Sequence, residues 1–383
     1  MNFLRIRGAL IRRARLDWLP PIIREERFLG VSVASSLAFV FFGRSIMERL
    51  VDPLWLTLIF AWLFVAVLGS ALGVARQAHH LALRLGEPYG TLILTLAATS
   101  IEVISISGVM LHGANNPTLA RDTIFAVVMI IRNGMVGLSL LVGGWRHREQ
   151  NYNLQGANAY LSVIIPLSVL SLVLPNFTVT TAGPTLSRLQ EAFLGLVTAG
   201  LYVIFLGIQT GRHRGYFTLG EIDNPPASTQ PSGHRLAWQI FLLLAYIVPV
   251  AYLAEQLARP IDHLIEEVHA PAPLGGLIIA ILVVTPETIS AVRAAGANRL
   301  QRSVNISLGS VLATVSLTIP SMMVISHLTG RELVLGLQNA DLLMLPLTLL
   351  VSIVTFGSGR TNILQGAVHF VLFAAYLVLV FQG

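Results

Sequence analysis

PYGTLILTLAATSIEVIS (residues 88–105) and PLGGLIIAILVVTPETIS (residues 273–290) are two copies of one pattern. Eight positions agree at a constant offset of 185, one of them as serine against threonine. Each copy places one glutamate, Glu102 or Glu287, inside an apolar stretch. A carboxylate near the centre of a membrane span costs about 2.5–3.5 kcal/mol on insertion scales. Two of them at equivalent places of an internal repeat therefore indicate a function, and the paired ion sites of a transporter provide one.

The composition places the chain in a membrane. Hydrophobic residues make up 54% of the 383 residues and charged residues only 11%, which excludes a soluble globular domain. A membrane-spanning helix needs about 20 apolar residues. The apolar runs are continuous and not alternating, so they predict helices and not the strands of a barrel. We therefore expect an all-α polytopic membrane protein with about eleven transmembrane helices, at residues 28–47, 53–74, 88–112, 121–143, 156–175, 187–210, 237–256, 271–296, 301–327, 339–356 and 363–382.

The basic residues predict the orientation in the membrane. All 25 are arginine, and the net charge is +6. If the N-terminus is cytoplasmic, eighteen arginines fall on the cytoplasmic side of the predicted helices and six on the other side. This is the positive-inside bias, so the basic charge orients the chain in the lipid bilayer and does not imply a nucleic-acid partner. We expect a multi-pass protein of the cytoplasmic (inner) membrane with a cytoplasmic N-terminus and a periplasmic C-terminus. The sequence has no cysteine, which excludes disulfides, thiolate metal sites and cysteine nucleophiles.

The chain divides at its most polar internal stretch. Residues 211–236 contain Asn-Pro-Pro and Pro-Ser-Gly clusters that are typical of a linker. We predict a cytoplasmic segment with the first transmembrane helix at 1–52, a five-helix repeat at 53–210, the cytoplasmic linker at 211–236 and a second five-helix repeat at 237–383. Because each repeat has an odd number of helices, the second enters the membrane in the opposite sense. Inverted repeats of this kind place a substrate site at their interface, near the midplane.

The repeat continues into the next helix of each half and supplies more oxygen atoms. A Leu-x-Arg motif at residues 119–121 recurs at 300–302 when the first connecting loop is allowed four extra residues. In this alignment Asn133 falls opposite Thr314. Carboxylate, hydroxyl and amide oxygens together replace the hydration shell of a hard cation. The candidate cation and proton site comprises two glutamates, which we expect to bind the metal, and their polar neighbours: Thr99, Ser100, Glu102, Ser105 and Asn133 in the first repeat, and Thr285, Glu287, Ser290, Ser310 and Thr314 in the second.

These motifs carry a resemblance to a known family. The most specific are Gly-Glu-Pro-Tyr-Gly-Thr-Leu-Ile at 86–93, Ser-Ile-Glu at 100–102, Thr-Pro-Glu at 285–287 and Ser-Leu-Gly-Ser at 307–310. With the count of one plus five plus five helices, the chain resembles the calcium/cation exchanger superfamily, closest to its ChaA-type bacterial cation/proton antiporters. The resemblance covers nearly the whole chain after residue 50. It implies secondary active exchange of a metal cation (Ca²⁺, Na⁺ or K⁺) for protons by alternating access. In this mechanism Glu102 and Glu287 bind the cation and the protons in turn. The cation and the protons are substrates, and no cofactor is expected.

The sequence departs from the calcium exchangers of this superfamily at four places. Many of them have Gly-Asn three residues before the repeat glutamate, where this chain has Ala-Thr at 98–99 and Val-Val at 283–284. Ala313 stands where glutamine is usual, and Arg132 stands where a small residue precedes the repeat asparagine. A sodium or potassium antiporter tolerates the loss of strong oxygen ligands better than a calcium-selective one does. The sequence leaves the choice of cation open.

Arg132 is predicted near the centre of its helix. An unpaired guanidinium is costly there, so the side chain should face the protein interior and pair with a carboxylate. Two interpretations remain open. Arg132 takes the place of a cation beside Glu102 or Glu287. Alternatively, it is the structural partner of an acid such as Asp122 or Glu191.

Two other classes of function are alternatives to the antiporter. An intramembrane protease needs a serine nucleophile segment with a histidine at matching depth, and a prenyl transferase needs clustered aspartates. The sequence contains neither pattern. A passive cation channel is the remaining alternative. His327 and His369 are interpreted as helix contacts, and each hydroxyl or amide residue taken singly is also compatible with helix packing. The oligomeric state is not encoded in any pattern we recognise.

Overall fold

The computed structural model describes residues 26–86, 89–112, 117–218 and 233–382. Pro88 of the first repeat pattern, the segment before residue 26 and residues 219–232 of the expected linker lie outside the described residues. Within them, ten helical segments are long and apolar enough to span a membrane, and one further apolar helix is shorter. This confirms the all-α architecture with about eleven spans.

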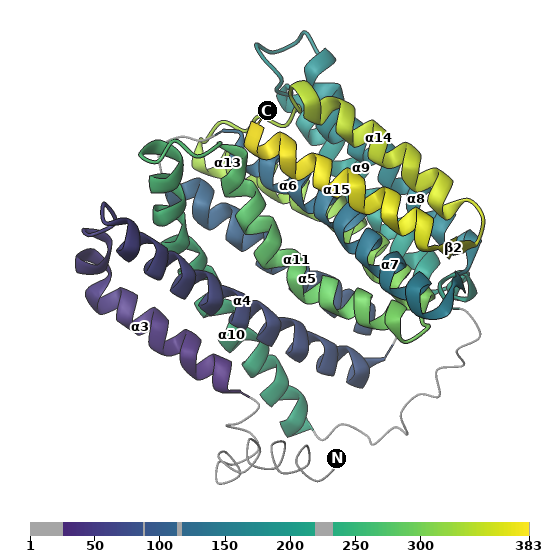
Figure 1. Cartoon of the computed structure of the whole chain (residues 1–383), viewed down its shortest axis with the longest axis horizontal. Coiled ribbons are helices and arrows are strands. Elements are labelled where there is room, and N and C mark those ends of the chain that lie inside the picture. Colours follow the sequence, from purple (N-terminus) through teal and green to yellow (C-terminus); the bar gives the residue numbers. More distant parts are fainter. Residues whose placement is uncertain (1–25, 87–88, 113–116, 219–232, 383) are drawn as a thin grey trace, which may run out of the picture.

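The helices and strands follow one another along the chain (Figure 1). They are α3 (Arg27–Met47), α4 (Pro53–Leu85), α5 (Tyr89–His112), α6 (Leu119–Met129), α7 (Val136–His147), β1 (Glu149–Asn151), α8 (Leu154–Ser168), α9 (Arg188–Thr210), α10 (Gly233–Glu266), α11 (Pro273–Gly296), α12 (Leu300–Ala313), α13 (Ile319–Thr329), α14 (Asn339–Phe356), β2 (Arg360–Asn362) and α15 (Ile363–Gln382).

Among the described residues, π-helical turns occur at Ile130–Met135, Val169–Val173 and Thr314–Thr318, and the first and third lie at matching places of the two repeats. α6 continues through the π-helical turn Ile130–Met135 into α7, and α12 continues through Thr314–Thr318 into α13. Asn133 and Thr314, which the sequence alignment sets opposite each other, lie in these two turns. Because π-helical turns are rare and often occur at functional sites, their matched positions indicate that both regions are candidate parts of a functional site.

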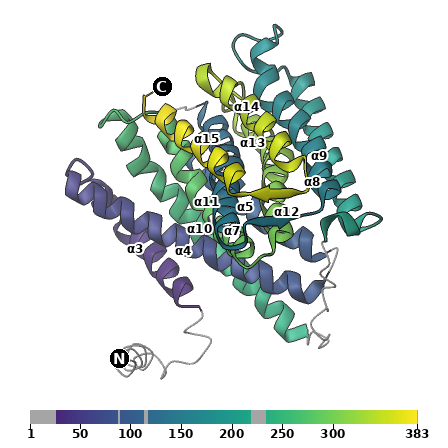
Figure 2. The same ribbon diagram turned by 45° about the vertical axis from the view of Figure 1, so that its right-hand side comes forward.

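The helices that carry the glutamates lie in the middle of the molecule. In both ribbon views α4 and α10 lie on one side with α3 outside them, and α8, α9, α14 and α15 lie on the other side (Figures 1 and 2). α5 and α11 lie between these groups, and each of them contacts both α4 and α10. The arrangement therefore places Glu102 of α5 and Glu287 of α11 inside the bundle.

Glycines allow two of the closest helix contacts. A Cβ at Gly276 of α11 would lie 2.7 Å from the backbone of Asp122 and Thr123 in α6. A Cβ at Gly73 of α4 would collide with the ring of Tyr246 in α10. Small residues of this kind let membrane helices approach closely, and here they fix α11 against α6 and α4 against α10.

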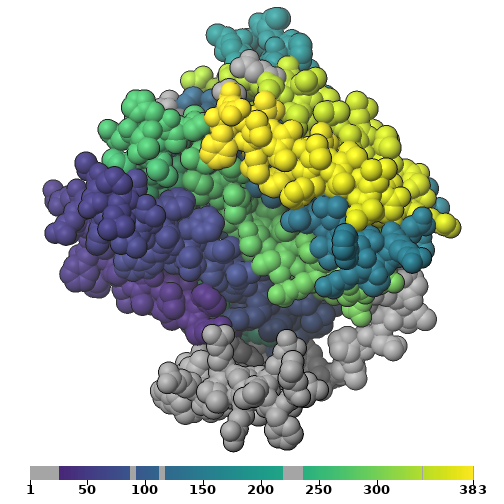
Figure 3. All heavy atoms as spheres, viewed as in Figure 1, coloured from purple at the N-terminus to yellow at the C-terminus, as the bar shows by residue number. Residues whose placement is uncertain are grey.

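The two halves of the chain are also joined by a short sheet and a common core. β1 and β2 pair antiparallel, with Gln150 opposite Thr361, between the end of α7 and the start of α15. Apolar side chains of both halves, from Ile106 to Val380, form one continuous buried cluster. The outer helices expose large apolar side chains such as Phe41 of α3 and Val371 of α15, as lipid-facing helices do. Figure 3 shows α3 and α15 on opposite sides of one face, with α11 visible between them.

Candidate functional site

Glu102 lies on α5 and is buried, with 4% of its surface exposed. Its Oε2 accepts a hydrogen bond of 2.9 Å from the Thr314 hydroxyl, which comes from the second half of the chain. Its Oε1 has no hydrogen-bond partner among the described residues. A buried carboxyl oxygen without a partner is costly, so a proton or a cation is the natural occupant at this atom.

Two more unpartnered oxygens lie on the same face of α5. Thr99 and Ser105 are buried three residues before and three residues after Glu102, and this spacing places all three on one side of a helix. Within the part of the chain that the structure describes, neither the Thr99 Oγ1 nor the Ser105 Oγ has a hydrogen-bond partner. The face thus offers a carboxylate and two hydroxyls, which are the ligand types that alkali and alkaline-earth cations take.

Glu287 on α11 is half-buried and has its own hydroxyl partner. The Ser310 Oγ donates a short hydrogen bond to the Glu287 Oε2. Ser310 and Thr314 are four residues apart, on successive turns of one span, and Glu102 and Glu287 are close enough to interact electrostatically. One helix therefore connects the two repeat carboxylates.

Three of the expected polar residues do not face these carboxylates through their hydroxyls. The Ser100 Oγ donates to the Leu96 carbonyl, the Thr285 Oγ1 to the Ile281 carbonyl and the Ser290 Oγ to the Pro286 carbonyl, each one turn earlier in its own helix. Ser100 and Thr285 precede the glutamates by two residues, which turns them to the other side of the helix. In this conformation their hydroxyls donate hydrogen bonds to backbone carbonyls of α5 and α11 and do not contact the carboxylates.

Asn133 belongs to a separate buried network. Its Nδ2 donates to the Thr348 Oγ1 of α14 at 2.9 Å, so its Oδ1 is the acceptor that faces the His369 Nδ1 of α15 at 3.1 Å. The His369 Nε2 lies 2.9 Å from the Thr355 Oγ1. The amide oxygen can only accept, so the Nδ1 donates to it, and the Nε2 and the threonine hydroxyl complete the pairing of the ring. The amide that the sequence analysis expected in the cation site here joins the first repeat to α14 and α15.

Arg132 is fully buried beside this network. None of its side-chain nitrogens has a hydrogen-bond partner among the described residues, and its guanidinium carbon lies 5.4 Å from the centre of the Phe356 ring. The structure does not pair it with Asp122, which pairs with Arg121 at 2.8 Å instead. Glu191 on α9 faces Arg188 and His327 instead. Arg132 is thus stabilised in this conformation by its contact with an aromatic face and not by a carboxylate.

The sequence matches a known family over most of its length. Residues 55–211 and 238–382 match the family described as "Sodium/calcium exchanger protein". The chain is 42% identical over 365 residues to the putative ionic transporter y4hA of Sinorhizobium fredii, with 95% of each chain covered. The chain belongs to the sodium/calcium exchanger protein family. It is also 37% identical over 321 residues to the sodium-potassium/proton antiporter ChaA of Escherichia coli, covering 83% of this chain and 87% of that one.

Solved structures of exchangers have the same fold. The structure of native YfkE matches with a TM-score of 0.71 at 20% sequence identity, and the alignment covers 93% of this chain and 100% of YfkE. At this identity the likeness concerns the fold alone. The recognition from the sequence motifs is therefore confirmed at the level of family and fold.

Sequence reasoning missed the partners of His369. The sequence predicts His369 as a helix contact, in agreement with these hydrogen bonds, but the two threonines, Thr348 and Thr355, are not marked by any pattern. No repeat pattern marks α14 and α15, since the motif alignment ends with the second helix of each half. Two features of the sequence could have indicated the network: His369 in the last predicted span and the pair Arg132-Asn133 in the fourth. Polar side chains inside a membrane span need buried partners.

Proposed function

We propose that this exchanger-family protein is a secondary active antiporter that exchanges a metal cation for protons by alternating access. The observation that carries the proposal is the set of unpartnered buried oxygens on α5, namely the Glu102 Oε1, the Thr99 Oγ1 and the Ser105 Oγ. Their neighbour Glu287 adds a second carboxylate. Support for antiport comes from the relative in Escherichia coli, whose name describes a sodium-potassium/proton antiporter.

Competition at the carboxylates gives a physical basis for the exchange. Two carboxylates in a poorly hydrated site repel each other, so their charge has to be balanced by protons or by a cation. The same oxygens cannot hold a proton and coordinate a metal at the same time. Loading of one substrate therefore releases the other, and a change of access between the two events produces antiport.

The proposed cycle moves protons inward and the cation outward. With the site open to the periplasm, protons bind Glu102 and Glu287 and displace the cation. Rearrangement of the repeats then exposes the acids to the cytoplasm, where they deprotonate and bind the next cation. If more proton charge than cation charge moves in a cycle, the membrane potential contributes about 2.3 kcal/mol per net charge per 100 mV.

We assign Na⁺ or K⁺ as the preferred cations, ahead of Ca²⁺. Divalent calcium prefers six to eight oxygen ligands. In this chain the Asn133 amide is engaged by Thr348 and His369, and the hydroxyls of Ser100 and Thr285 donate to their own helices. The remaining protein ligands are few, which suits a partly hydrated monovalent ion better.

The repeat boundaries and the orientation belong to the same proposal. Residues 53–210 and 237–383 form the two inverted repeats, 211–236 the cytoplasmic linker, and the protein lies in the cytoplasmic membrane with its N-terminus inside. Support comes from the two matched segments, 55–211 and 238–382, and from the arginine distribution.

The test uses everted membrane vesicles from a strain that lacks other antiporters. The vesicles are energised, and a ΔpH-sensitive dye is followed while Na⁺, K⁺ or Ca²⁺ is added to wild type, Glu102→Gln and Glu287→Gln. We expect one or more cations to dissipate ΔpH in the wild type and neither variant to respond at normal expression. Glu191→Gln, which removes a half-buried glutamate from α9, is the matched control and should respond like the wild type.

Two outcomes would contradict the proposal. If neither variant differs from the wild type, the repeat glutamates do not carry the transported ions. If a cation crosses the membrane in a flux assay without any change of ΔpH, the protein is a passive channel. A response to Ca²⁺ alone would agree with the antiporter proposal but would contradict the assignment of a monovalent cation.

A further inference from the structure

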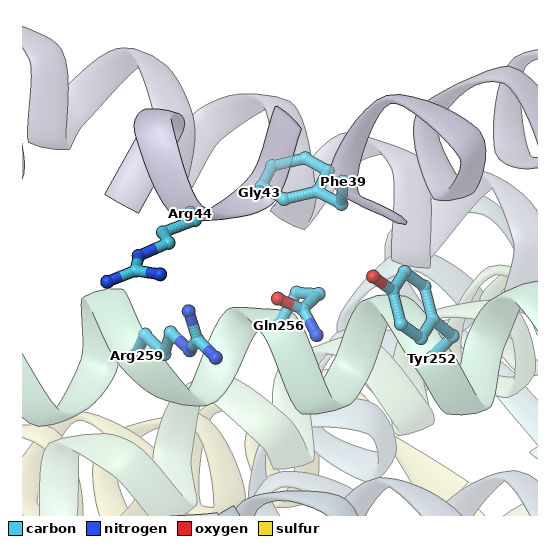
Figure 4. A pocket seen from close by; sticks show the side chains of 6 residues that line it. All are labelled: Phe39, Gly43, Arg44, Tyr252, Gln256 and Arg259. Carbon is cyan, nitrogen blue, oxygen red and sulfur yellow. The ribbon is translucent and has the colours of Figure 1, made fainter. Parts of the chain in front are cut away.

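A cavity of about 410 Å³ opens between α3 and α10, away from the two repeat glutamates. It is lined by Phe39, Gly43 and Arg44 of α3 and by Tyr252, Gln256 and Arg259 of α10 (Figure 4). α3 precedes the first family-matched residue, 55, so one wall of this cavity belongs to a helix outside the family match. None of the lining residues belongs to the candidate cation site, so the exchange reaction does not explain the cavity.

The absence of a side chain at Gly43 helps to keep the gap open. A Cβ there would meet only Phe39, at 3.9 Å and on the same helix. No atom of α10 lies within 4 Å of that position, although Tyr252 and Gln256 face the gap from the other side. The two helices are thus spaced widely enough here for a molecule to enter between them.

Positive charge faces the cavity from both walls. Figure 4 shows the guanidinium groups of Arg44 and Arg259 at the same end of the gap, one from each helix. The Arg44 side chain is 95% exposed, and its contact with Glu48 at 3.5 Å is an exposed pair of little energetic weight. Arg259 makes other interactions in the protein, but a guanidinium has five donor N–H groups and can serve more than one partner.

Polar groups extend the binding surface along α10. Figure 4 shows the Gln256 amide beside the arginines and the Tyr252 hydroxyl further along α10, and both groups can donate hydrogen bonds to a bound molecule. Glu255 of the same helix lies near Tyr252, so the surroundings also contain a negative charge. Two guanidinium groups facing one gap match the geometry of a phosphate, because its oxygens accept paired N–H donors.

The position along the helices matches the depth of lipid headgroups. Arg44 lies in the last turn of α3, and Arg259 lies near the end of the 34-residue α10, which is longer than the hydrocarbon core of a bilayer. Arginine and tyrosine side chains are typical of this interfacial depth. On the outer face of α3, Val40 and Phe41 are 59% and 74% exposed, and they offer apolar surface for an acyl chain.

We infer that this cavity binds the phosphodiester group of a membrane phospholipid, held between Arg44 and Arg259. The bound lipid joins α3 to α10 and places its acyl chain along the exposed apolar face of α3. In the predicted topology this end of both helices is periplasmic, so the lipid comes from the outer leaflet. The inference is independent of which cation the protein transports.

The test uses the full chain, purified in detergent and depleted of lipid. Dioleoyl phosphatidylglycerol is the probe, a galactosyl diacylglycerol without phosphate is the lipid control, and inorganic phosphate is the ion control. Native mass spectrometry reports bound lipid, and thermal unfolding reports stabilisation. For the wild type we expect one retained phosphatidylglycerol and a higher melting temperature, with no effect of the galactolipid or of phosphate.

Variants locate the site. Arg44→Gln and Arg259→Gln should each bind phosphatidylglycerol about tenfold more weakly, as expected for the loss of a charge-assisted hydrogen bond. Arg49→Gln is the matched control, because Arg49 is exposed just beyond α3 and does not line the cavity. Arg44 is so exposed that its replacement leaves the fold intact even if Arg259→Gln is unstable. Equal lipid binding by Arg44→Gln and wild type, equal stabilisation by the galactolipid, or stabilisation by inorganic phosphate alone would each overturn the inference.

Discussion

Replacing Thr314 with valine tests the link between the two halves of the candidate site. Valine keeps the volume of the threonine but removes the hydroxyl that donates to the Glu102 Oε2 at 2.9 Å. Thr314 is 1% exposed, so water cannot replace the lost donor without a rearrangement. A hydrogen bond to a charged group contributes about 1.5–3 kcal/mol. Since every 1.4 kcal/mol corresponds to a factor of ten, the charged, cation-binding form of Glu102 should bind its ion about ten- to a hundredfold more weakly.

The assay is cation titration in energised everted vesicles at a fixed pH. The KM for the responding cation should rise by about ten- to a hundredfold in Thr314→Val. Thr314→Ser keeps the hydroxyl and should restore a KM within about threefold of the wild type, a difference of less than 1 kcal/mol. Western blotting of the vesicles normalises the initial rates to the amount of protein.

A control from the neighbouring network separates a site effect from a general loss of packing. Thr348→Val removes the acceptor of the Asn133 amide and leaves the Glu102 contact untouched. It should lower the melting temperature and change the KM by less than about threefold. If Thr314→Val has the KM of the wild type, or if Thr348→Val raises the KM as much as Thr314→Val does, the reasoning about Glu102 is refuted.

Three further predictions concern stability and are checked by thermal unfolding of purified protein. Gly276→Ala should destabilise the protein by about 1–3 kcal/mol, because the new Cβ meets the backbone of α6 at 2.7 Å, whereas Gly200→Ala, with nothing within 4 Å, should be neutral or stabilising. Arg132→Met should leave the melting temperature unchanged or raise it, because it replaces an unpaired buried charge with an apolar side chain, and the free energy of unfolding should increase by up to about 1–4 kcal/mol. A large decrease in the melting temperature would show that another group holds the guanidinium. His369→Ala should cost about 2–4 kcal/mol by leaving the Asn133 Oδ1 and the Thr355 Oγ1 without partners, and an unchanged melting temperature would argue against the network.

The fold and the two carboxylates could be predicted from the sequence because both signals are local. Continuous apolar runs predict spans wherever they occur, and a glutamate inside such a run stands out against its surroundings. The offset of 185 between the two copies tied Glu102 to Glu287 without any knowledge of packing. Thr314 is the residue that the alignment sets opposite Asn133 once four extra loop residues are allowed, and Ser310 is a hydroxyl residue of the same predicted helix. The structure places both hydroxyls on the carboxylates.

The direction of the other side chains could not be predicted in the same way. The alignment sets Asn133 opposite Thr314, but it does not say which neighbours α14 and α15 bring to the first repeat. In the structure, Thr348 and His369 form hydrogen bonds with the nitrogen and the oxygen of the Asn133 amide. Ser100 could have been assigned to the far side of α5 from its two-residue spacing to Glu102, because helix geometry alone separates these positions by about half a turn.

The resulting asymmetry bears on how the two carboxylates act together. The hydroxyls of Ser310 and Thr314, which donate to the two acids, come from the second repeat, while Asn133, the residue of the first repeat opposite Thr314, contacts α14 and α15. Ser310 and Thr314 lie only one turn apart on this span, so a shift of the span against α5 and α11 would weaken both hydrogen bonds in the same step. Each bond favours the charged form of its acid. One movement can therefore change the charge of both acids together, and this is the coupling that exchange of protons for a cation requires.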